Sequence, residues 1–370
     1  MATIPRLRDD LRGLAPYAVG KDMAPVRLNN NENPHGPADG MTNRLMRAVR
    51  ESLATINRYP GGSPERLAAA LAEYVAPWCR SENIWPGNGS NEALLYLLLA
   101  FGGPQQKAML FAPTYAMHEQ LCRITATPVA VVARDDDFAL RAEAAAAAME
   151  EHEPTLVFLC SPNNPTGTPL PPDVIATVLR YEPSLLIIDE AYFEYSQLPS
   201  AVSLVRDHPN VVVARTMSKA FAFAGARVGY AVGHAQVCAE LQKISPPYRM
   251  STITEALAMA ALEMADLIPA QVAMALSERE RVRTELESLG YRVADSDANF
   301  LLFGTVPDDH AEYEYYRDRG VLIRNVGPRG WLRTAIGEPA ENDSFLACAA
   351  ERRRTSRSVR FMQEGPACTV

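Results

Sequence analysis

Long apolar runs, paired cysteines and a strong excess of one charge are all missing from this 370-residue sequence. The longest apolar run, at 93–103, is too short to span a bilayer, and the first residues lack the apolar core of a signal peptide. The six cysteines form no CxxC pair and no zinc-spaced cluster with histidine. A net charge of −8 argues against a nucleic-acid-binding surface. We therefore expect a cytoplasmic globular protein with reduced thiols and no metal site.

Short apolar segments alternate with helical patterns through the middle of the chain. Five of these segments are predicted to be strands: 107–113, 127–133, 154–162, 184–192 and 210–216. They are almost entirely apolar, which is typical of strands covered on both faces. Helical patterns occupy Ser90–Phe101 and Leu140–His152. This rhythm predicts an α/β fold in which a mainly parallel central sheet lies between two helical layers.

The pattern of predicted helices and strands changes near residue 255. A long helical pattern runs from Glu255 to Leu289 and ends at Gly290, which is a plausible C-cap. Shorter strand-like segments and a helix from Ala340 onward follow it. We expect an N-terminal arm over 1–40, a large domain over 41–255, a smaller α+β domain over 256–352 and a solvated basic tail over 353–370.

Polar side chains follow the predicted strands where each strand ends. Asp189 ends one strand, Lys219 follows the next, and Asn164 lies in the turn after a third. Ser90 begins a helix, whose free backbone N–H groups favour an anion, and Arg227 supplies a further cation. Because the carboxyl ends of parallel strands meet at one edge of a sheet, we expect these residues to form an active site there.

This set of side chains fits a phosphorylated pyridine aldehyde. Lys219 would form a Schiff base with it, and Asp189 would pair with the ring N–H, so that the ring can accept electrons. Tyr192 and Asn164 can hydrogen-bond the phenolic oxygen. The phosphate would be held by Ser90, Asn91, Thr216, Ser218 and Arg227. A lowered pKa would make the lysine a usable nucleophile and proton carrier.

Several segments carry a family resemblance. "SPNNPTG", "DEAY" and "SKAFAFAGARVGY" are similar to the signatures of fold-type I, pyridoxal-phosphate-dependent aminotransferases. "RLNNNENPHGP", "NIWPGNGSNEAL" and "LIRNVGPRGWLRTAIGEPAENDSFL" resemble blocks of the histidinol-phosphate aminotransferases, and those of actinobacteria most. The resemblance covers about residues 10 to 350. It implies a homodimer that uses pyridoxal 5′-phosphate to transfer an amino group between glutamate and histidinol phosphate in histidine biosynthesis.

The same resemblance implies roles for single residues. Lys219 would hold the cofactor and move the proton in the 1,3-shift, with Asp189 and Tyr192 as its catalytic partners. Tyr115 would stack on the cofactor ring, and Tyr59 would reach the phosphate of the cofactor in the neighbouring subunit. The implied substrate-binding residues are Arg333, Arg324, Tyr17, Tyr248 and Asn88. Of these, Arg333 would grip the carboxylate of glutamate and the phosphate of histidinol phosphate in turn.

Three alternatives stay open at this point. An aminotransferase for phenylalanine and tyrosine would share the cofactor residues, and so would a carbon–carbon lyase such as the phosphothreonine decarboxylase relative. A non-catalytic regulator of the same build would need an added DNA-binding domain. Arg249 is expected to add a charge near the pocket mouth, and His35 and His118 are expected to be bystanders.

Overall fold

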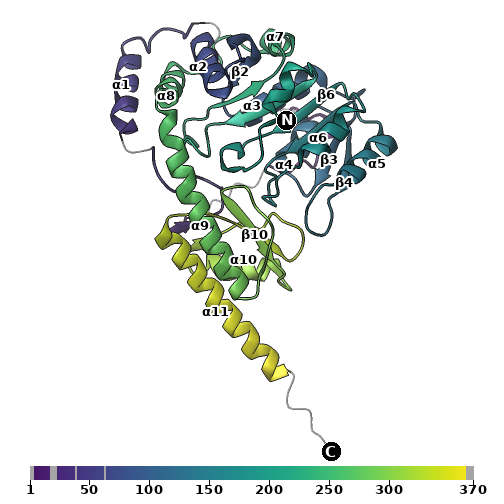
Figure 1. Ribbon diagram of the computed structural model, residues 1–370, viewed down its shortest axis with the longest axis vertical. Coiled ribbons are helices and arrows are strands. Elements are labelled where there is room, and N and C mark those ends of the chain that lie inside the picture. Colours follow the sequence, from purple (N-terminus) through teal and green to yellow (C-terminus); the bar gives the residue numbers. More distant parts are fainter. Residues whose placement is uncertain (1–3, 17–22, 38–39, 62–63, 364–370) are drawn as a thin grey trace, which may run out of the picture.

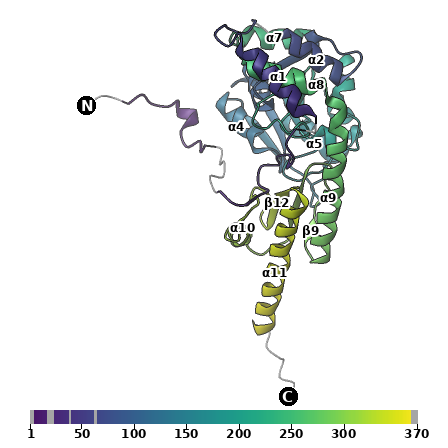
Figure 2. The ribbon, with the colours of Figure 1, turned by 90° about the vertical axis from the view of Figure 1, so that its left-hand side faces the viewer.

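The computed structural model describes residues 4–16, 23–37, 40–61 and 64–363. A large α/β domain lies above a smaller domain, and helix α9 (Ile268–Ser288) runs from one to the other (Figure 1). The N-terminal segment leaves the body of the molecule in the view of Figure 2. The candidate site forms where the two domains meet.

A seven-stranded sheet with the order β2-β8-β7-β6-β5-β3-β4 forms the large domain. Its strands are β2 (Ile84–Gly87), β3 (Ala108–Ala112), β4 (Val129–Ala133), β5 (Leu156–Cys160), β6 (Leu185–Asp189), β7 (Val211–Thr216) and β8 (Gly229–Val232). Strands β3 to β7 are parallel, whereas β8 is antiparallel to both of its neighbours. The mainly parallel sheet and its five predicted strands are confirmed. The sequence pattern does not reveal β2 and β8, because each has four residues and contains glycine or proline.

Helices cover both faces of this sheet (Figure 1). They are α1 (Met41–Leu53), α2 (Glu65–Val75), α3 (Ser90–Phe101), α4 (Ala116–Ile124), α5 (Ala142–His152), α6 (Pro172–Leu179), α7 (Ala235–Ile244) and α8 (Thr252–Leu262). Alternate residues of β6 join separate apolar clusters: Leu186 and Ile188 in one, Leu185 and Ile187 in the other. Burial on both faces is therefore the physical reason why the strands are continuously apolar.

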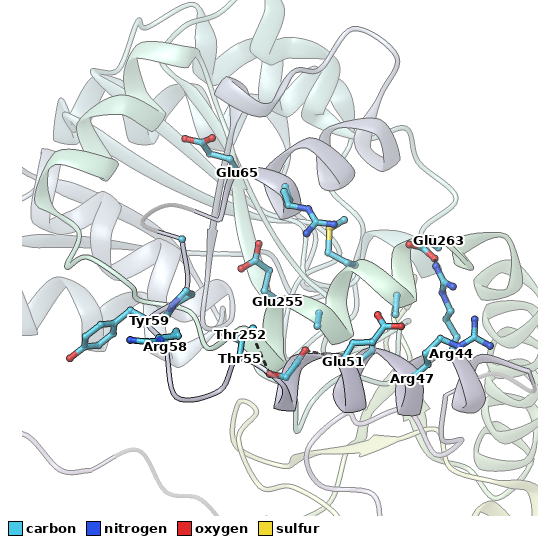
Figure 3. Close-up of a pocket in the computed structure, with 18 residues that line it drawn as sticks. Arg44, Arg47, Glu51, Thr55, Arg58, Tyr59, Glu65, Thr252, Glu255 and Glu263 are labelled. Atoms are coloured by element: carbon cyan, nitrogen blue, oxygen red, sulfur yellow. Dashed lines mark hydrogen bonds and ion pairs between the residues drawn. The ribbon is translucent and has the colours of Figure 1, made fainter.

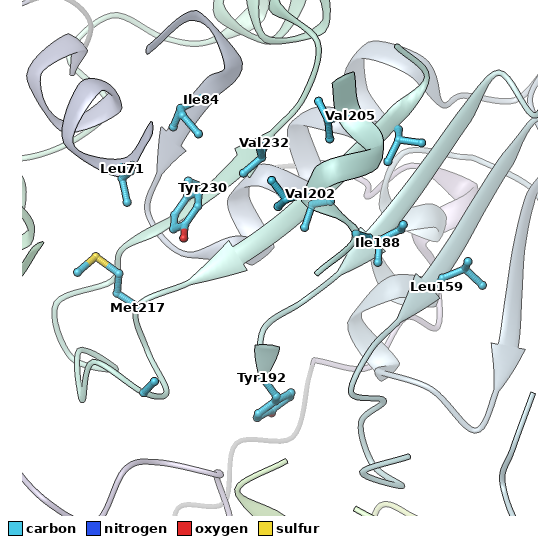
Figure 4. Close-up of a cluster of buried hydrophobic side chains, with 14 of the residues drawn as sticks. Leu71, Ile84, Leu159, Ile188, Tyr192, Val202, Val205, Met217, Tyr230 and Val232 are labelled. Carbon is cyan, nitrogen blue, oxygen red and sulfur yellow. The ribbon is translucent and has the colours of Figure 1, made fainter. Parts of the chain in front are cut away.

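The first of these clusters leads to the site. Figure 4 shows Ile188 and Leu159 on their strands, with Tyr192 beyond the end of β6. Val202 and Val205, from the 3₁₀ segment Ala201–Arg206, pack against the same cluster. The apolar core thus fixes β5 and β6 rigidly, and the polar residues after them inherit that fixed position.

The smaller domain carries a three-stranded antiparallel sheet with the order β12-β10-β9. Its elements are α9, β9 (Arg292–Val293), β10 (Phe300–Gly304), α10 (Asp309–Arg317), β11 (Val321–Leu322), β12 (Trp331–Ala335) and α11 (Pro339–Gln363). Strand β1 (Val26–Arg27) pairs in parallel with β11. The N-terminal segment is therefore joined to the smaller domain, although the two are far apart in the sequence.

The single helix predicted over Glu255–Leu289 is wrong. Two helices, α8 and α9, replace it, and the chain bends by 60° between them. Pro269 lies in the first turn of α9, where a proline is tolerated but cannot continue a preceding helix. Within the described residues, no single helix has the length and apolar character needed to cross a membrane; this bent pair meets that test only when both arms are counted.

The basic tail starts as the end of α11, which projects from the smaller domain (Figure 1). Arg352, just before the tail, pairs with Glu312 at 2.8 Å, and the guanidinium of Arg353, the first residue of the tail, lies 3.6 Å from the ring centroid of Tyr291. These contacts fix the first part of the tail to the domain, so the helix is longer than the sequence pattern suggests.

Candidate active site

A cavity of about 290 Å³ opens at the carboxyl edge of the large-domain sheet, facing the smaller domain. Twelve of the predicted site residues line it: Ser90, Asn91, Tyr115, Asn164, Asp189, Tyr192, Thr216, Ser218, Lys219, Arg227, Arg324 and Arg333. They come from the ends of separate strands, from the start of α3 and from the smaller domain. The fold therefore brings together site residues that are spread over more than 240 positions of the sequence.

Asp189 lies at the floor of this cavity with only 2% of its surface exposed. One carboxylate oxygen accepts the backbone N–H of Ala191 at 3.1 Å, and the other lies 3.0 Å from Nε2 of His118. His118 is fully buried in α4, and its second ring nitrogen has no partner among the described residues. The expectation that His118 is a bystander is wrong, because it is the side chain that holds a buried carboxylate in place.

Lys219 lies across the cavity, three residues after β7 ends. Its Nζ donates to the backbone oxygen of Asn30 at 3.0 Å and lies 5.5 Å from the ring centroid of Tyr192. Burial and, after it, the positive charge of Arg333 lower the pKa of this amine to about 7, while the charge of Glu32 opposes both. An amine with such a pKa is neutral in a large fraction of molecules near pH 7, so it can act as a nucleophile and as a base.

The hydroxyl of Tyr192 is buried beside Asn164. The side-chain amide of Asn31 donates to this hydroxyl at 3.0 Å, and that of Asn164 approaches it at 3.5 Å. Burial raises the pKa of Tyr192, with Arg333 and the Asn31 hydrogen bond opposing the rise. The phenol is therefore protonated at neutral pH and has a proton to offer within the cavity.

An anion cradle surrounds the start of α3. The N-cap position of this helix is Gly89, which supplies no side-chain cap, so the first N–H groups stay available. The Thr216 hydroxyl donates to Ser218 at 2.8 Å, and Arg227 donates to the same Ser218 oxygen at 3.3 Å. A Cβ on Gly229 would collide with the backbone nitrogen of Ser90, so glycine there lets β8 approach the helix start. Hydroxyls, N–H groups and a guanidinium converge as a bound phosphate requires.

Two arginines of the smaller domain complete the cavity. Arg333, in β12, donates to the side-chain oxygen of Asn164 at 2.6 Å and to the backbone oxygen of Asn29 at 2.7 Å. Arg324 pairs with Arg333 through two backbone hydrogen bonds of 2.8 Å, so the two residues are held side by side. An arginine that faces a cavity and is only 6% exposed is well placed to bind a carboxylate or a phosphate.

Tyr59 and Tyr248 lie outside this cavity. Their rings stack on each other with centroids 4.8 Å apart, and Tyr59 is 82% exposed. Tyr59 borders a second cavity of about 820 Å³ between α1, α8 and segment 58–61 (Figure 3). Charged residues of both signs line that cavity, and Arg44 pairs with Glu263 there. Within its own chain, Tyr59 therefore does not touch the predicted cofactor site.

The other predicted residues have different positions. The Asn88 amide donates to the backbone oxygen of Arg249 at 2.9 Å and to Glu92, so it is turned away from the cavity. Tyr17 lies outside the described residues. The expected charge of Arg249 at the pocket mouth is corrected: its guanidinium lies 4.4 Å from the ring centroid of Trp85 and does not line the cavity.

Sequence reasoning missed the N-terminal contribution. Asn30, Asn31 and Glu32 line the cavity, although they belong to a segment that the sequence presents as an irregular arm. Arg333 and Lys219 each donate to a backbone oxygen of this segment. The density of asparagines in "RLNNNENP" is the one local signal, because side-chain amides are common where backbone groups need partners away from helices and sheets.

The comparisons with known proteins agree with this geometry. The family model for "Aminotransferase class I and II" matches residues 24–348. The chain is 47% identical over 341 residues to a histidinol-phosphate aminotransferase of Thermobifida fusca, covering 92% of this chain and 93% of that protein. It is 47% identical over 357 residues to that of Mycolicibacterium smegmatis, covering 95% and 94%.

A solved structure gives the same result for the fold. The histidinol-phosphate aminotransferase of Sinorhizobium meliloti in complex with pyridoxal-5′-phosphate matches with a TM-score of 0.84 at 26% sequence identity. The match covers 96% of this chain and 99% of that one. Both domains and their connection are therefore shared, and not only the central sheet.

Proposed function

This chain belongs to the class I and II aminotransferases and, within them, to the histidinol-phosphate aminotransferases, and from this membership we propose its reaction. Glutamate donates its amino group, and imidazole-acetol phosphate accepts it and becomes histidinol phosphate. The exchange has two halves that share one cavity. The resemblance read from the sequence motifs is confirmed at the level of the family.

The cofactor is pyridoxal 5′-phosphate, and the residues of the cavity fit it. When bound, this cofactor supplies a carbonyl that condenses with amines and a ring that accepts electrons. Asp189 would hold the ring N–H, the start of α3 with Ser218 and Arg227 would hold the phosphate, and Tyr192 would face the phenolic oxygen. Each of these groups supplies the complementary charge or the hydrogen-bond partner that its part of the cofactor needs.

Lys219 performs the proton transfer. Once free of the Asn30 oxygen, this amine, with its pKa of about 7, would take a proton from the α-carbon of glutamate. The resulting ammonium would then deliver the same proton to the carbonyl-derived carbon of the cofactor, because Lys219 is the only lysine among the described residues that line the cavity. Tyr192, whose ring faces the amine at 5.5 Å, limits where the lysine can swing.

The observation that carries the substrate proposal is the pair of small-domain arginines. Glutamate presents two carboxylates, and histidinol phosphate presents a phosphate; a planar guanidinium can bind either through two parallel hydrogen bonds. Arg333 faces the cavity opposite Lys219, and Arg324 is held beside it. One pocket can thus serve two dissimilar substrates, and the imidazole needs only an uncharged part of the cavity.

A substrate panel on the purified holoenzyme tests this proposal. Histidinol phosphate, phenylalanine, tyrosine and phosphothreonine are added in turn, and the absorbance of the bound cofactor is followed. We expect histidinol phosphate to convert the cofactor at the lowest concentration. Conversion by phenylalanine and tyrosine alone would instead assign an aromatic aminotransferase, and release of carbon dioxide from phosphothreonine would assign a lyase.

A homodimer forms a second part of the proposal. Exposed apolar side chains gather on α1 and just after it: Met46 at 65%, Leu53 at 54% and Ile56 at 51%. They adjoin the exposed Tyr59, which would reach the cofactor phosphate in the neighbouring subunit. Sedimentation equilibrium measures the mass directly, and a fully active monomer would rule out this assembly. A cytoplasmic location stays a prediction from the cysteine usage.

A further inference from the structure

Asn31 is a buried residue of the N-terminal segment that no part of the proposed chemistry uses so far. Its side chain is 1% exposed, yet it borders the cavity. Its backbone has a φ of +52°, a left-handed conformation in which asparagine is several-fold enriched over most other residues. A residue held in this way is over-determined by its surroundings, which is common where a side chain must keep one orientation.

The hydrogen bond between Asn31 and Tyr192 has a direction. Nδ2 of Asn31 donates to the Tyr192 oxygen at 3.0 Å, and Nδ2 of Asn164 approaches the same oxygen at 3.5 Å. A phenol has one proton, and two amide N–H groups occupy its acceptor side. The proton is therefore left for a third partner. If the Asn31 amide were reversed, its oxygen would take that proton instead.

In this orientation the other half of the Asn31 amide is left unpaired. Its Oδ1 has no hydrogen-bond partner among the described residues, although the side chain is almost fully buried. An unpaired buried acceptor costs free energy that a protein retains only for a reason. Keeping N–H toward Tyr192 is such a reason, since the alternative would pair the oxygen and consume the phenol proton.

Contacts from both domains hold Asn31 in place. Asn299, at the start of the smaller-domain sheet, donates to the backbone oxygen of Asn31 at 3.2 Å. The two neighbouring carbonyl groups, of residues 29 and 30, accept from Arg333 at 2.7 Å and from Lys219 at 3.0 Å. These two cations are also the charged groups that face Tyr192. These contacts fix the backbone that carries the Asn31 amide.

We propose that Asn31 is a positioning residue that acts through Tyr192: it directs the single hydroxyl proton of that tyrosine toward the phenolic oxygen of pyridoxal 5′-phosphate. The inference rests on the proposed cofactor site and not on the identity of the substrate. A directed proton stabilises the form of the cofactor whose oxygen is negatively charged. Loss of that direction therefore favours the protonated form of the cofactor at any given pH.

The test is a pH titration of the absorbance of the bound cofactor in the holoenzyme. Asn31→Asp is nearly isosteric but offers no N–H and accepts the tyrosine proton; we expect the apparent pKa of the cofactor to rise by about one unit or more. Asn31→Gly keeps the left-handed backbone and removes the amide, so we expect a smaller rise of roughly half a unit. Because glycine tolerates this backbone, a folding defect does not confuse the result.

Two controls separate positioning from packing. Asn33→Ala removes an amide of the same segment, which donates to the Ala220 oxygen at 3.2 Å and not to Tyr192; its titration should match the wild type. Tyr192→Phe and the double variant Tyr192→Phe with Asn31→Gly should titrate together, because the effect passes through the hydroxyl. Wild-type titration in both Asn31 variants, or a further shift in the double variant, overturns the proposal. If histidinol phosphate fails in the substrate panel but the Asn31 variants still shift the titration, only the proposed substrate is wrong.

Discussion

The two walls of the active-site cavity are built in different ways. The large-domain wall consists of Asp189 at the end of β6, Lys219 after β7, and further residues at strand ends and at the start of α3, and the packed sheet fixes their positions. The small-domain wall consists of Arg324, Arg333 and the N-terminal segment 29–32, which meet only in the folded protein. In the proposed function, the first wall would hold the cofactor and the second would meet the substrate.

This difference predicts that the groups around the cofactor tolerate less movement than the groups that would meet the substrate. A strand end packed into an apolar core cannot shift without opening that core, so the groups around the cofactor stay in register. The small-domain wall is linked by hydrogen bonds between side chains and backbone oxygens, such as the 2.7 Å bond from Arg333 to Asn29. Bonds of this kind can exchange for bonds to a ligand with little change in packing.

The largest effect should come from the large-domain wall. Lys219→Ala removes the only lysine of the cavity lining, and we expect the single-turnover rate with histidinol phosphate to fall by about 10⁴-fold, the upper range for a positioned acid–base group. Stopped-flow absorbance of the cofactor measures this rate. Lys243→Ala is the matched control, since Lys243 is 66% exposed in α7 and pairs only with Glu240. Retained turnover in Lys219→Ala would remove the amine from the mechanism.

A smaller effect should come from the opposite wall. Arg333→Ala removes charge-assisted hydrogen bonds worth about 1.5–3 kcal/mol, so kcat/KM should fall by roughly 10- to 100-fold for glutamate and for histidinol phosphate alike. Arg333→Lys keeps the charge but loses the planar fork, and we expect it to recover only part of the loss. Steady-state kinetics with both substrates provide the measurement.

Arg319→Ala is a suitable control for this arginine. Arg319 is exposed on the smaller domain and pairs with Glu351 at 3.3 Å, so its loss should leave both kcat/KM values unchanged. A drop for histidinol phosphate alone would show that the two substrates use different arginines, and the idea of one shared anion site would then be wrong.

The difference between the two walls also determines which site residues could be predicted from the sequence. Asp189, Asn164 and Lys219 follow apolar strands directly, so periodicity and strand ends were enough to place them at one edge. His118 pairs with a carboxylate 71 residues away, and Asn31 with a phenol 161 residues away. No local pattern distinguishes such residues from ordinary polar ones. The sequence pattern did not predict the bend between α8 and α9 for a related reason, since the helical pattern continues on both sides of the break.

The two walls are coupled electrostatically through Lys219, and pH provides the finest test of that coupling. The pKa of the amine is lowered to about 7, mainly by burial and next by the charge of Arg333. Only the neutral amine attaches the cofactor, so the attachment rate in apoenzyme should rise about tenfold per pH unit below the pKa and level off above it. In Arg333→Ala the cation is gone, so the midpoint should move to higher pH, toward the ordinary value of a lysine. Glu32 acts in the opposite direction, and Glu32→Gln should therefore move the midpoint down. A midpoint that is the same in all three proteins would mean that burial alone sets the pKa, and that the small-domain wall does not act on the large-domain wall before substrate arrives.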